Sequence, residues 1–291
     1  MRVVVALPLA VAITVFVRGA WRLRRCRRPG IGAGRLVAAA VGFTALGVAL
    51  SDTVHAAGHA LFTAHMAQHL LLVVIAAPAL LLADPLAVTL WGLPRPMRSG
   101  IGRLLVPRHA LRRALAVGTR MTVAWPAYVL VLWLWHLPGP YQAALRSGPL
   151  HDLEHLLFFG AAVLFWWPVL LPAPRLAPPP HPAARVAYLV LGALQNSALG
   201  LILASRTDPL YPSYATSALA WGLSAADDQS RGGLLMWSVG SAVDMIAVLC
   251  VVARAIVQTS VVDAAAAAKD RGSVVTIAPS SAHEKAKKAD T

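Results

Sequence analysis

Seven long apolar stretches dominate this chain, and each approaches the length of a membrane-crossing helix. They lie at residues 3–21, 35–50, 65–83, 121–137, 151–171, 185–204 and 232–256. A helix needs about 20 mostly apolar residues to cross the roughly 30 Å hydrocarbon core of a bilayer. Apolar residues make up 58% of the chain and charged residues only 13%, an excess that a water-soluble domain does not bury. We therefore predict an all-α integral membrane protein, a bundle of seven transmembrane helices in a lipid bilayer.

The basic residues lie between these stretches, and their distribution predicts an orientation. If the N-terminus lies outside, 22 of the 26 lysines and arginines fall on the cytoplasmic side. Basic residues near the ends of spans stay in the cytoplasm, so we predict an outside N-terminus and a cytoplasmic C-terminus. The same scatter leaves the net charge of +14 without a single basic patch, which argues against a nucleic-acid partner.

The ends of the sequence differ from its middle. The first stretch runs into the basic segment WRLRRCRR without an A-x-A-like cleavage site, so we expect an anchor and not a cleaved signal peptide. We expect residues 1–258 to form the membrane domain. Residues 259–291 are rich in Ala, then in Ser and Lys, which is typical of a disordered cytoplasmic tail. Cys26 and Cys250 are isolated and form no CxxC motif, so neither a disulfide framework nor thiol-based metal transfer has support.

Histidines recur at helical spacing near the predicted outer surface. His65 and His69 are four residues apart in HMAQH, His151 and His155 are four apart in HDLEH, and His136 closes the fourth stretch in WLWHLP. Residues at i and i+4 share one face of a helix, so each pair can present two imidazoles to one ion. Zinc, copper, iron and nickel all suit imidazole. The alternative is that these side chains hydrogen-bond water or headgroups, but five at one depth favour a metal site.

Further polar residues lie near this layer. His55 and His59 form a third pair in the outer loop, where they can act as outer ligands that capture the ion or as ordinary interfacial residues. Asp152 and Glu154 lie between the two HDLEH histidines, and either can accept a hydrogen bond from a ligating imidazole.

Two aspartates and two methionines near this layer each allow two interpretations. Asp227 and Asp228 precede the seventh stretch and can serve either as caps of that helix or as ligands. Met66 and Met236 offer soft sulfur, although methionine in an apolar helix more often fills space.

Four segments, in order, resemble the CtaG family of cytochrome c oxidase assembly factors: HMAQHLLLVVIAAPALLL, WLWHLPGPYQAAL, LHDLEHLLFFGAAVLFWWPV and DDQSRGGLLMW. The resemblance extends over about residues 1–258. It implies a seven-helix bacterial plasma-membrane protein that helps to mature the haem–copper oxidase by supplying copper, expected as Cu(I), to an oxidase subunit or through a copper chaperone. It assigns metal ligation to His65, His69, His136, His151, His155 and Asp228. Ser230 departs from the family pattern, where a second Gln is expected after Gln229.

We therefore favour a non-enzymatic, copper-binding assembly factor. Because neutral imidazole binds the metal, we expect copper affinity to fall as the pH drops through about 6.5. A copper importer is the alternative, with a route lined by Gln195, Asn196 and Asp244, although these polar groups can equally bond helix to helix. HDLEH also fits the H-x-x-E-H pattern of zinc peptidases, but no downstream carboxylate ligand is evident. A haem-binding electron carrier is disfavoured because haem ligands usually lie deeper, on opposing helices.

Overall fold

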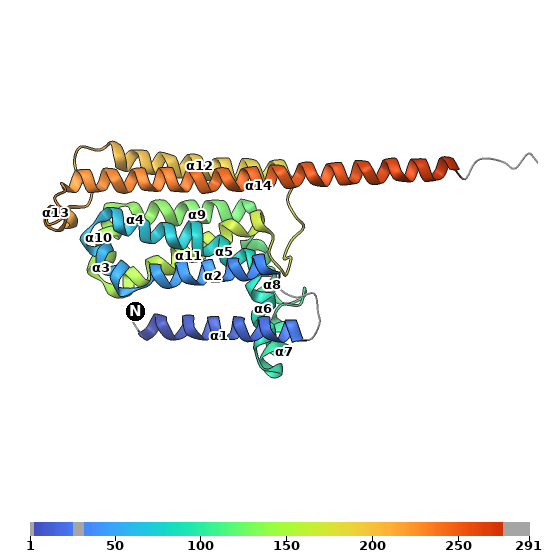
Figure 1. Cartoon of the computed structure of the whole chain (residues 1–291). Coiled ribbons are helices and arrows are strands. Elements are labelled where there is room, and N and C mark those ends of the chain that lie inside the picture. Colours follow the sequence, from blue (N-terminus) through green and yellow to red (C-terminus); the bar gives the residue numbers. More distant parts are fainter. Residues whose placement is uncertain (1–2, 26–31, 276–291) are drawn as a thin grey trace, which may run out of the picture. The chain divides into compact units, whose positions relative to one another are not determined.

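The structure, a computed structural model, describes residues 3–25 and 32–275, and within these ranges it contains helices and no β-strand (Figure 1). The first half comprises α1 (Val3–Arg25), α2 (Ala33–Ala49), α3 (Asp52–Ala60), α4 (Phe62–Leu70), the π-helix η1 (Leu71–Ala76), α5 (Ala77–Leu82), α6 (Pro85–Gly92), α7 (Arg95–Leu104) and α8 (Ala110–Gly118). The second half comprises α9 (Met121–His136), α10 (Pro138–Arg146), α11 (Gly148–Leu170), α12 (Pro182–Ser205), the 3₁₀-helix η2 (Pro212–Tyr214), α13 (Ala215–Leu219) and α14 (Ala225–Val275).

Every apolar stretch singled out in the sequence falls on a helix. Five helical segments are long and apolar enough to cross a membrane: Ala6–Arg25, Phe62–Leu82, Gly148–Leu170, Pro182–Ser205 and Ala225–Ser260. The other two stretches lie on α2 and α9, which have 17 and 16 residues. Each is joined to a short neighbour, α2 to α3 with a bend of 53° and α8 to α9 with a bend of 70°. The described chain therefore has five candidate spans, or up to seven if each bent pair counts as one.

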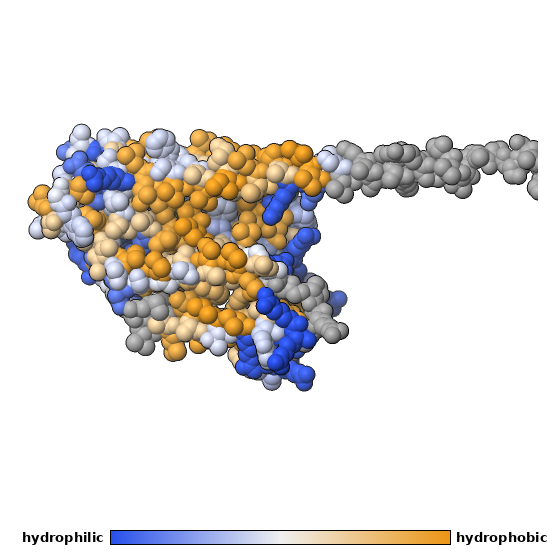
Figure 2. Space-filling model, viewed as in Figure 1, coloured by the Kyte–Doolittle hydropathy of each residue, from blue (hydrophilic) through white to orange (hydrophobic). Residues whose placement is uncertain are grey.

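Large apolar side chains are exposed along these helices, as lipid contact requires. Leu130 on α9, Leu156 on α11 and Leu194 on α12 are each more than 60% exposed. Figure 2 shows apolar side chains over the sides of the helices on the face in view, with hydrophilic side chains gathered toward their ends. Long apolar helices with exposed apolar sides are the mark of a helical membrane protein.

The turn between α2 and α4 is built from local capping. Ser51 accepts a hydrogen bond from the backbone N–H of Val54 at 3.3 Å and so caps α3, in keeping with the preference of serine for this position. Leu61 is extended and separates α3 from α4, and α3 packs against α4. This turn brings the histidines of α3 close to those of α4.

Glycines allow α12 and α4 to approach the first part of α14 closely. A β-carbon on Gly233 would lie 2.6 Å from the carbonyl oxygen of Gly200, and one on Gly232 would lie 2.4 Å from the ring of Phe62. Small residues at such crossings let helix backbones meet without a steric clash. The start of α4 is thereby held against the start of α14.

The chain divides into two compact units, Met1–Val248 and Leu249–Thr291. All candidate site residues lie in the first. In the second, α14 continues to Val275, so the structure differs from the expectation that disorder begins at residue 259. Alanine has the highest helix propensity, and the run of five alanines after Asp263 favours continuation of the helix. Residues 276–291, the remainder of the predicted tail, lie outside the described residues.

Candidate metal centre

Four of the predicted histidines meet between α4 and α11. His65 and His69 lie one turn apart on α4, and His151 and His155 lie one turn apart on α11; all four are buried. The ring centroids of His65 and His151 are 5.0 Å apart, and those of His69 and His155 are 5.4 Å apart. The i,i+4 pairs therefore face each other across the helix contact, as their spacing predicted.

The nitrogens of these rings are close enough to share an ion. One ligand atom from each of His65, His69 and His155 lies within 4.8 Å of the other two. The Nε2 atoms of His65 and His69 are 3.0 Å apart. Ligand nitrogens at about 2.0–2.1 Å from a tetrahedral ion lie about 3.3 Å from one another. The spacing in the structure thus fits a small metal ion after a slight adjustment of the rings. We call His65, His69 and His155 the inner group.

Glu154 lies among these imidazoles, with its carboxylate near their Nε2 atoms. Its side chain is completely buried, and its carboxylate oxygens lie 3.8 Å from Nε2 of His65, of His69 and of His151. Neither oxygen accepts a hydrogen bond from any residue that the structure describes. A buried carboxylate without such partners is strongly unfavourable unless a cation or a proton neutralises it. With His65 and His151 it forms a second group of atoms within 4.8 Å, the middle group. Asp152, the other carboxylate of this segment, is exposed.

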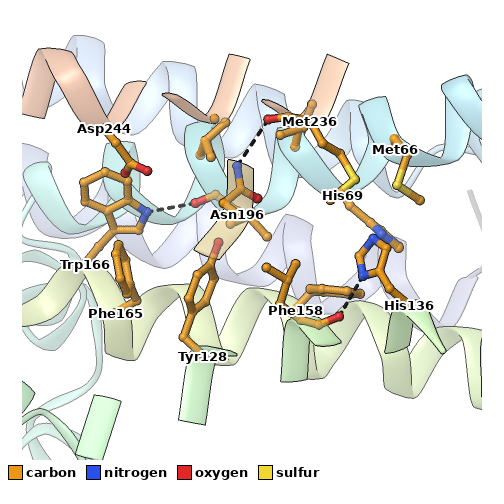
Figure 3. Close-up of a pocket in the computed structure, with 15 residues that line it drawn as sticks. Met66, His69, Tyr128, His136, Phe158, Phe165, Trp166, Asn196, Met236 and Asp244 are labelled. Atoms are coloured by element: carbon orange, nitrogen blue, oxygen red, sulfur yellow. Dashed lines mark hydrogen bonds between the residues drawn. The ribbon is translucent and has the colours of Figure 1, made fainter. Parts of the chain in front are cut away.

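His136 lies beside the inner group but belongs to none of the three-residue groups found within the described chain. Its Nδ1 is 2.7 Å from the carbonyl oxygen of Leu132, which makes Nδ1 the protonated nitrogen. Its Nε2 is buried and has no hydrogen-bond partner among the described residues. With His69 it lines one end of a cavity (Figure 3). Of the five predicted histidines, four are therefore in close contact, and the fifth, His136, lies next to them.

The cavity beside His69 and His136 continues into the helix bundle. Met66 and Met236 line it near the histidines, and Asp244 lies toward its other end (Figure 3). The Asn196 side chain also lines it and donates a hydrogen bond to the carbonyl oxygen of Met236 at 3.2 Å. Gln195 accepts a hydrogen bond from the indole N–H of Trp133 at 3.0 Å. Both amides therefore bond one helix to another, one of the two readings that the sequence left open.

Asp228 belongs to the first turn of α14, but its side chain reaches the start of α4 and caps that helix. Its carboxylate accepts hydrogen bonds from the backbone N–H groups of Phe62, at 2.6 Å, and Thr63, at 3.0 Å. Leu61 precedes α4 and has no polar side chain to do this, and a carboxylate there also favours the positive end of the helix dipole. Asp227, by contrast, exchanges hydrogen bonds with Ser224 at the start of α14. Asp228 therefore caps a neighbouring helix, whereas the sequence suggested either a cap of its own helix or a metal ligand. It belongs to none of the histidine groups found among the described residues.

Three buried tyrosines behind the histidines were missed in the sequence. The Tyr214 hydroxyl donates to the carbonyl oxygen of Gly58 at 2.9 Å and lies 3.2 Å from Nδ1 of His65 and 2.8 Å from the Tyr141 hydroxyl. The Tyr211 hydroxyl donates to the carbonyl oxygen of His136 at 2.7 Å. Burial raises the pKa of all three hydroxyls, so they remain neutral. The only hint in the sequence is the pair of tyrosines in the polar segment DPLYPSY, since a buried tyrosine needs a partner for its hydroxyl.

This contact fixes the tautomer of His65. Because the single hydroxyl proton of Tyr214 is donated to Gly58, its oxygen must accept from Nδ1–H of His65. The proton of His65 is then on Nδ1, and the lone pair of Nε2 points toward His69 and Glu154. Such an outer hydrogen bond orients a metal-ligating imidazole and raises its basicity.

Long apolar helices that enclose converging imidazoles and a buried carboxylate define a helical membrane protein with a candidate metal centre. The chain belongs to the cytochrome c oxidase caa3 assembly factor family (Caa3_CtaG), whose model matches residues 14–258. This confirms the resemblance seen in the sequence.

Two curated mycobacterial relatives have similar sequences. The uncharacterized protein ML1998 of Mycobacterium leprae is 25% identical over 247 residues, which cover 82% of this chain and 36% of that protein. The uncharacterized protein Mb0105 of Mycobacterium bovis is 28% identical over 214 residues, which cover 71% of this chain and 32% of that protein. The chain thus spans about a third of the length of the curated relatives it matches. No solved structure matches it.

Proposed function

We propose that this assembly factor binds copper at its histidine cluster and delivers it to the haem–copper oxidase, either directly or through a copper chaperone. The observation that carries the proposal is the inner group: three buried imidazoles with ligand atoms within 4.8 Å of one another. Glu154 beside them supplies a buried negative charge that a cation would neutralise. Of the six residues that the resemblance singled out, His65, His69, His151 and His155 serve as ligands. His136 is a neighbour available through Nε2, and Asp228 supports α4.

Copper fits this donor set together with the family. Imidazole alone does not choose among zinc, copper and nickel, but soft thioether sulfur favours Cu(I). Met66 and Met236 line the cavity that adjoins His69 and His136. An oxidase with a copper-containing centre needs that metal, so the family and the donor atoms point to the same ion. Copper is the cargo of the proposed function and not a permanent part of the protein.

Copper loading of the detergent-purified chain tests the proposal. We expect about one Cu(I) per chain to remain after removal of loosely bound metal, because the chain has a single inner group and its three imidazoles are all buried. Mass spectrometric metal analysis measures the ratio, and a parallel zinc loading tests the preference for copper. Absence of retained copper in the folded wild-type protein would refute the proposal.

We further propose seven spans in a bacterial plasma membrane, with the N-terminus outside and the C-terminus in the cytoplasm. The basic helices α7 and α8 lie at the opposite end of the bundle from α3 and α13 (Figure 1). Because basic segments stay in the cytoplasm, the histidine end faces outward in this arrangement.

Cysteine labelling tests the orientation. Asp208→Cys and Arg108→Cys change exposed residues at the two ends, each in a Cys26→Ser/Cys250→Ser background. In intact cells a membrane-impermeant maleimide should label the cysteine at position 208, and that at position 108 only after permeabilisation. The reverse pattern would invert the topology.

The Tyr214 hydroxyl gives a test of how the centre is supported. Tyr214→Phe removes the hydrogen-bond acceptor that orients His65, so copper affinity should fall about 10- to 100-fold while saturating copper still gives the wild-type ratio. Tyr211→Phe is the matched control, because that hydroxyl donates to a backbone oxygen and, among the described residues, bonds no ligand ring. Competition with a Cu(I) chelator measures both. Equal affinity for Tyr214→Phe and the wild type would mean that the tautomer of His65 is fixed by other means.

Copper import is a second candidate, favoured by one observation. The cavity lined by His69 and His136 also reaches Asn196 and Asp244 farther along the bundle. Uptake of copper by proteoliposomes separates the two functions, since a factor that only binds and delivers copper leaves the vesicle interior free of it.

A further inference from the structure

A third cluster of imidazoles adjoins the centre on its exposed side. His55 and His59 on α3 and His151 on α11 have ligand atoms within 4.8 Å of one another. Their ring centroids are 4.6 Å apart for His55 and His59, 4.8 Å for His55 and His151, and 5.4 Å for His59 and His151. We call these three residues the outer group.

Each of the three groups shares one or more members with the next. His151 belongs to both the outer and the middle group, and His65 belongs to both the middle and the inner group. Exposure separates the outer group from the other two: His59 is exposed and His55 is half-buried, whereas the members of the middle and inner groups are all buried. A metal ion can therefore pass inward while one ligand always remains attached.

From this arrangement we infer that the outer group is the entry site for copper, and that the ion reaches the inner group by stepwise ligand exchange through the middle group. The inference rests on the proposed copper-binding function and extends it. In the first step the bonds from His55 and His59 break as bonds to His65 and Glu154 form, and His151 is retained. In the second step the bonds from His151 and Glu154 break as bonds to His69 and His155 form, and His65 is retained. The oxidation state of the copper does not change.

Shared ligands lower the barrier to such a passage for a physical reason. A bare cation in a low-dielectric interior is prohibitively unfavourable, so an ion crosses from solvent to the buried site only if coordination is never lost. The carboxylate of Glu154, with no hydrogen-bond donor among the described residues, offers a negative charge midway. The oxygen ligand is also a poorer partner for a soft ion than imidazole, which favours onward movement to the all-histidine inner group.

Close packing of α3 holds the outer group in place. Gly58 faces α4 so closely that a β-carbon there would lie 3.0 Å from the side-chain oxygen of Gln68 and 3.4 Å from the α-carbon of His65. The Tyr214 hydroxyl that accepts from His65 donates to the Gly58 carbonyl oxygen. The same side chain therefore fastens the helix of the outer group and orients the ligand of the inner group.

Loading kinetics test the inference. Purified protein is mixed with a Cu(I)–glutathione complex, and bound copper is followed over time and at equilibrium for the wild type and for His55→Ala/His59→Ala. We expect the variant to reach the wild-type ratio but at least about tenfold more slowly, since it lacks the entry ligands. His55→Gln/His59→Gln, which keeps polar side chains on α3, should be equally slow. Circular dichroism and size-exclusion chromatography verify that each variant is folded.

The outcomes separate the two proposals. If the wild type retains copper and both outer variants load at its rate, the entry role is wrong and the buried site stands. If both variants lose copper at equilibrium while folded, the outer group is the storage site and the inward path is wrong. If the wild type retains no copper, the copper-binding function itself fails.

Discussion

Replacing both His65 and His69 by alanine should abolish stable copper binding. The inner group then keeps one of its three imidazoles, and the middle group loses His65 as well. Loss of a residue that supports a ligand commonly weakens metal binding about 10- to 100-fold, so loss of two ligands should lower the affinity by at least about a hundredfold. The retained metal should fall from about one copper per chain to almost none after a wash with a Cu(I) chelator, by mass spectrometric metal analysis.

Two histidines elsewhere provide the matched control. His109 and His181 accept hydrogen bonds from the backbone N–H groups of Leu111 and Ala183 and so cap α8 and α12. The double variant His109→Asn/His181→Asn removes as many imidazoles and preserves both caps. Its copper ratio should equal that of the wild type. A folded His65→Ala/His69→Ala protein with the wild-type ratio, or loss of copper in the control, would show that the inner group does not hold the metal.

Asp228→Ala should destabilise the protein while leaving its metal site intact. The substitution removes the acceptor of two backbone N–H groups at the start of α4, one of them buried. An unsatisfied buried donor costs about 1–3 kcal/mol, and loss of the charge at the helix start adds roughly 0.3–1 kcal/mol. The free energy of unfolding should therefore fall by about 1–4 kcal/mol, visible as a lower thermal midpoint in detergent.

Two further substitutions separate capping from metal ligation. Asp228→Asn keeps one acceptor oxygen, so the loss should be intermediate, with the copper ratio unchanged. Asp227→Ala changes an exposed neighbour that exchanges hydrogen bonds with Ser224, and it should cost no more than about 1 kcal/mol. If Asp228→Asn instead lost its copper at an unchanged thermal midpoint, Asp228 would be a ligand, as the family resemblance first implied.

Local patterns in the sequence were sufficient for the helices and for the pairing of the histidines. Apolar runs such as 151–171 specify helices because their backbone must satisfy its own hydrogen bonds in lipid. HMAQH and HDLEH specify paired imidazoles because four residues make about one helical turn. The two shorter runs, 35–50 and 121–137, predicted helices correctly, but bends at both leave five to seven candidate spans.

The family resemblance also arose from the sequence, because the four segments keep their order along the chain, and the family match confirms it. The set of candidate metal ligands, by contrast, could not be obtained from the sequence alone. From the sequence, Glu154 and Asp152 were equally good candidates to accept a hydrogen bond from a ligating imidazole. In the structure Glu154 is completely buried among imidazoles, whereas Asp152 is exposed. Their difference depends on which face of α11 meets α4, and that is a property of packing.

The sequence by itself determined that this chain forms apolar helices, that its histidines come in pairs one turn apart, and which family it belongs to. Only the tertiary structure decided that Asp228 caps α4 from 165 and 166 residues away in the chain, and that Tyr214 orients His65 from a distance of 149 residues. It also decided that His151 and His65 link three groups of ligands. The reason is physical: helix formation depends on neighbours within one turn, whereas coordination and capping depend on atoms that only folding brings within 3–5 Å.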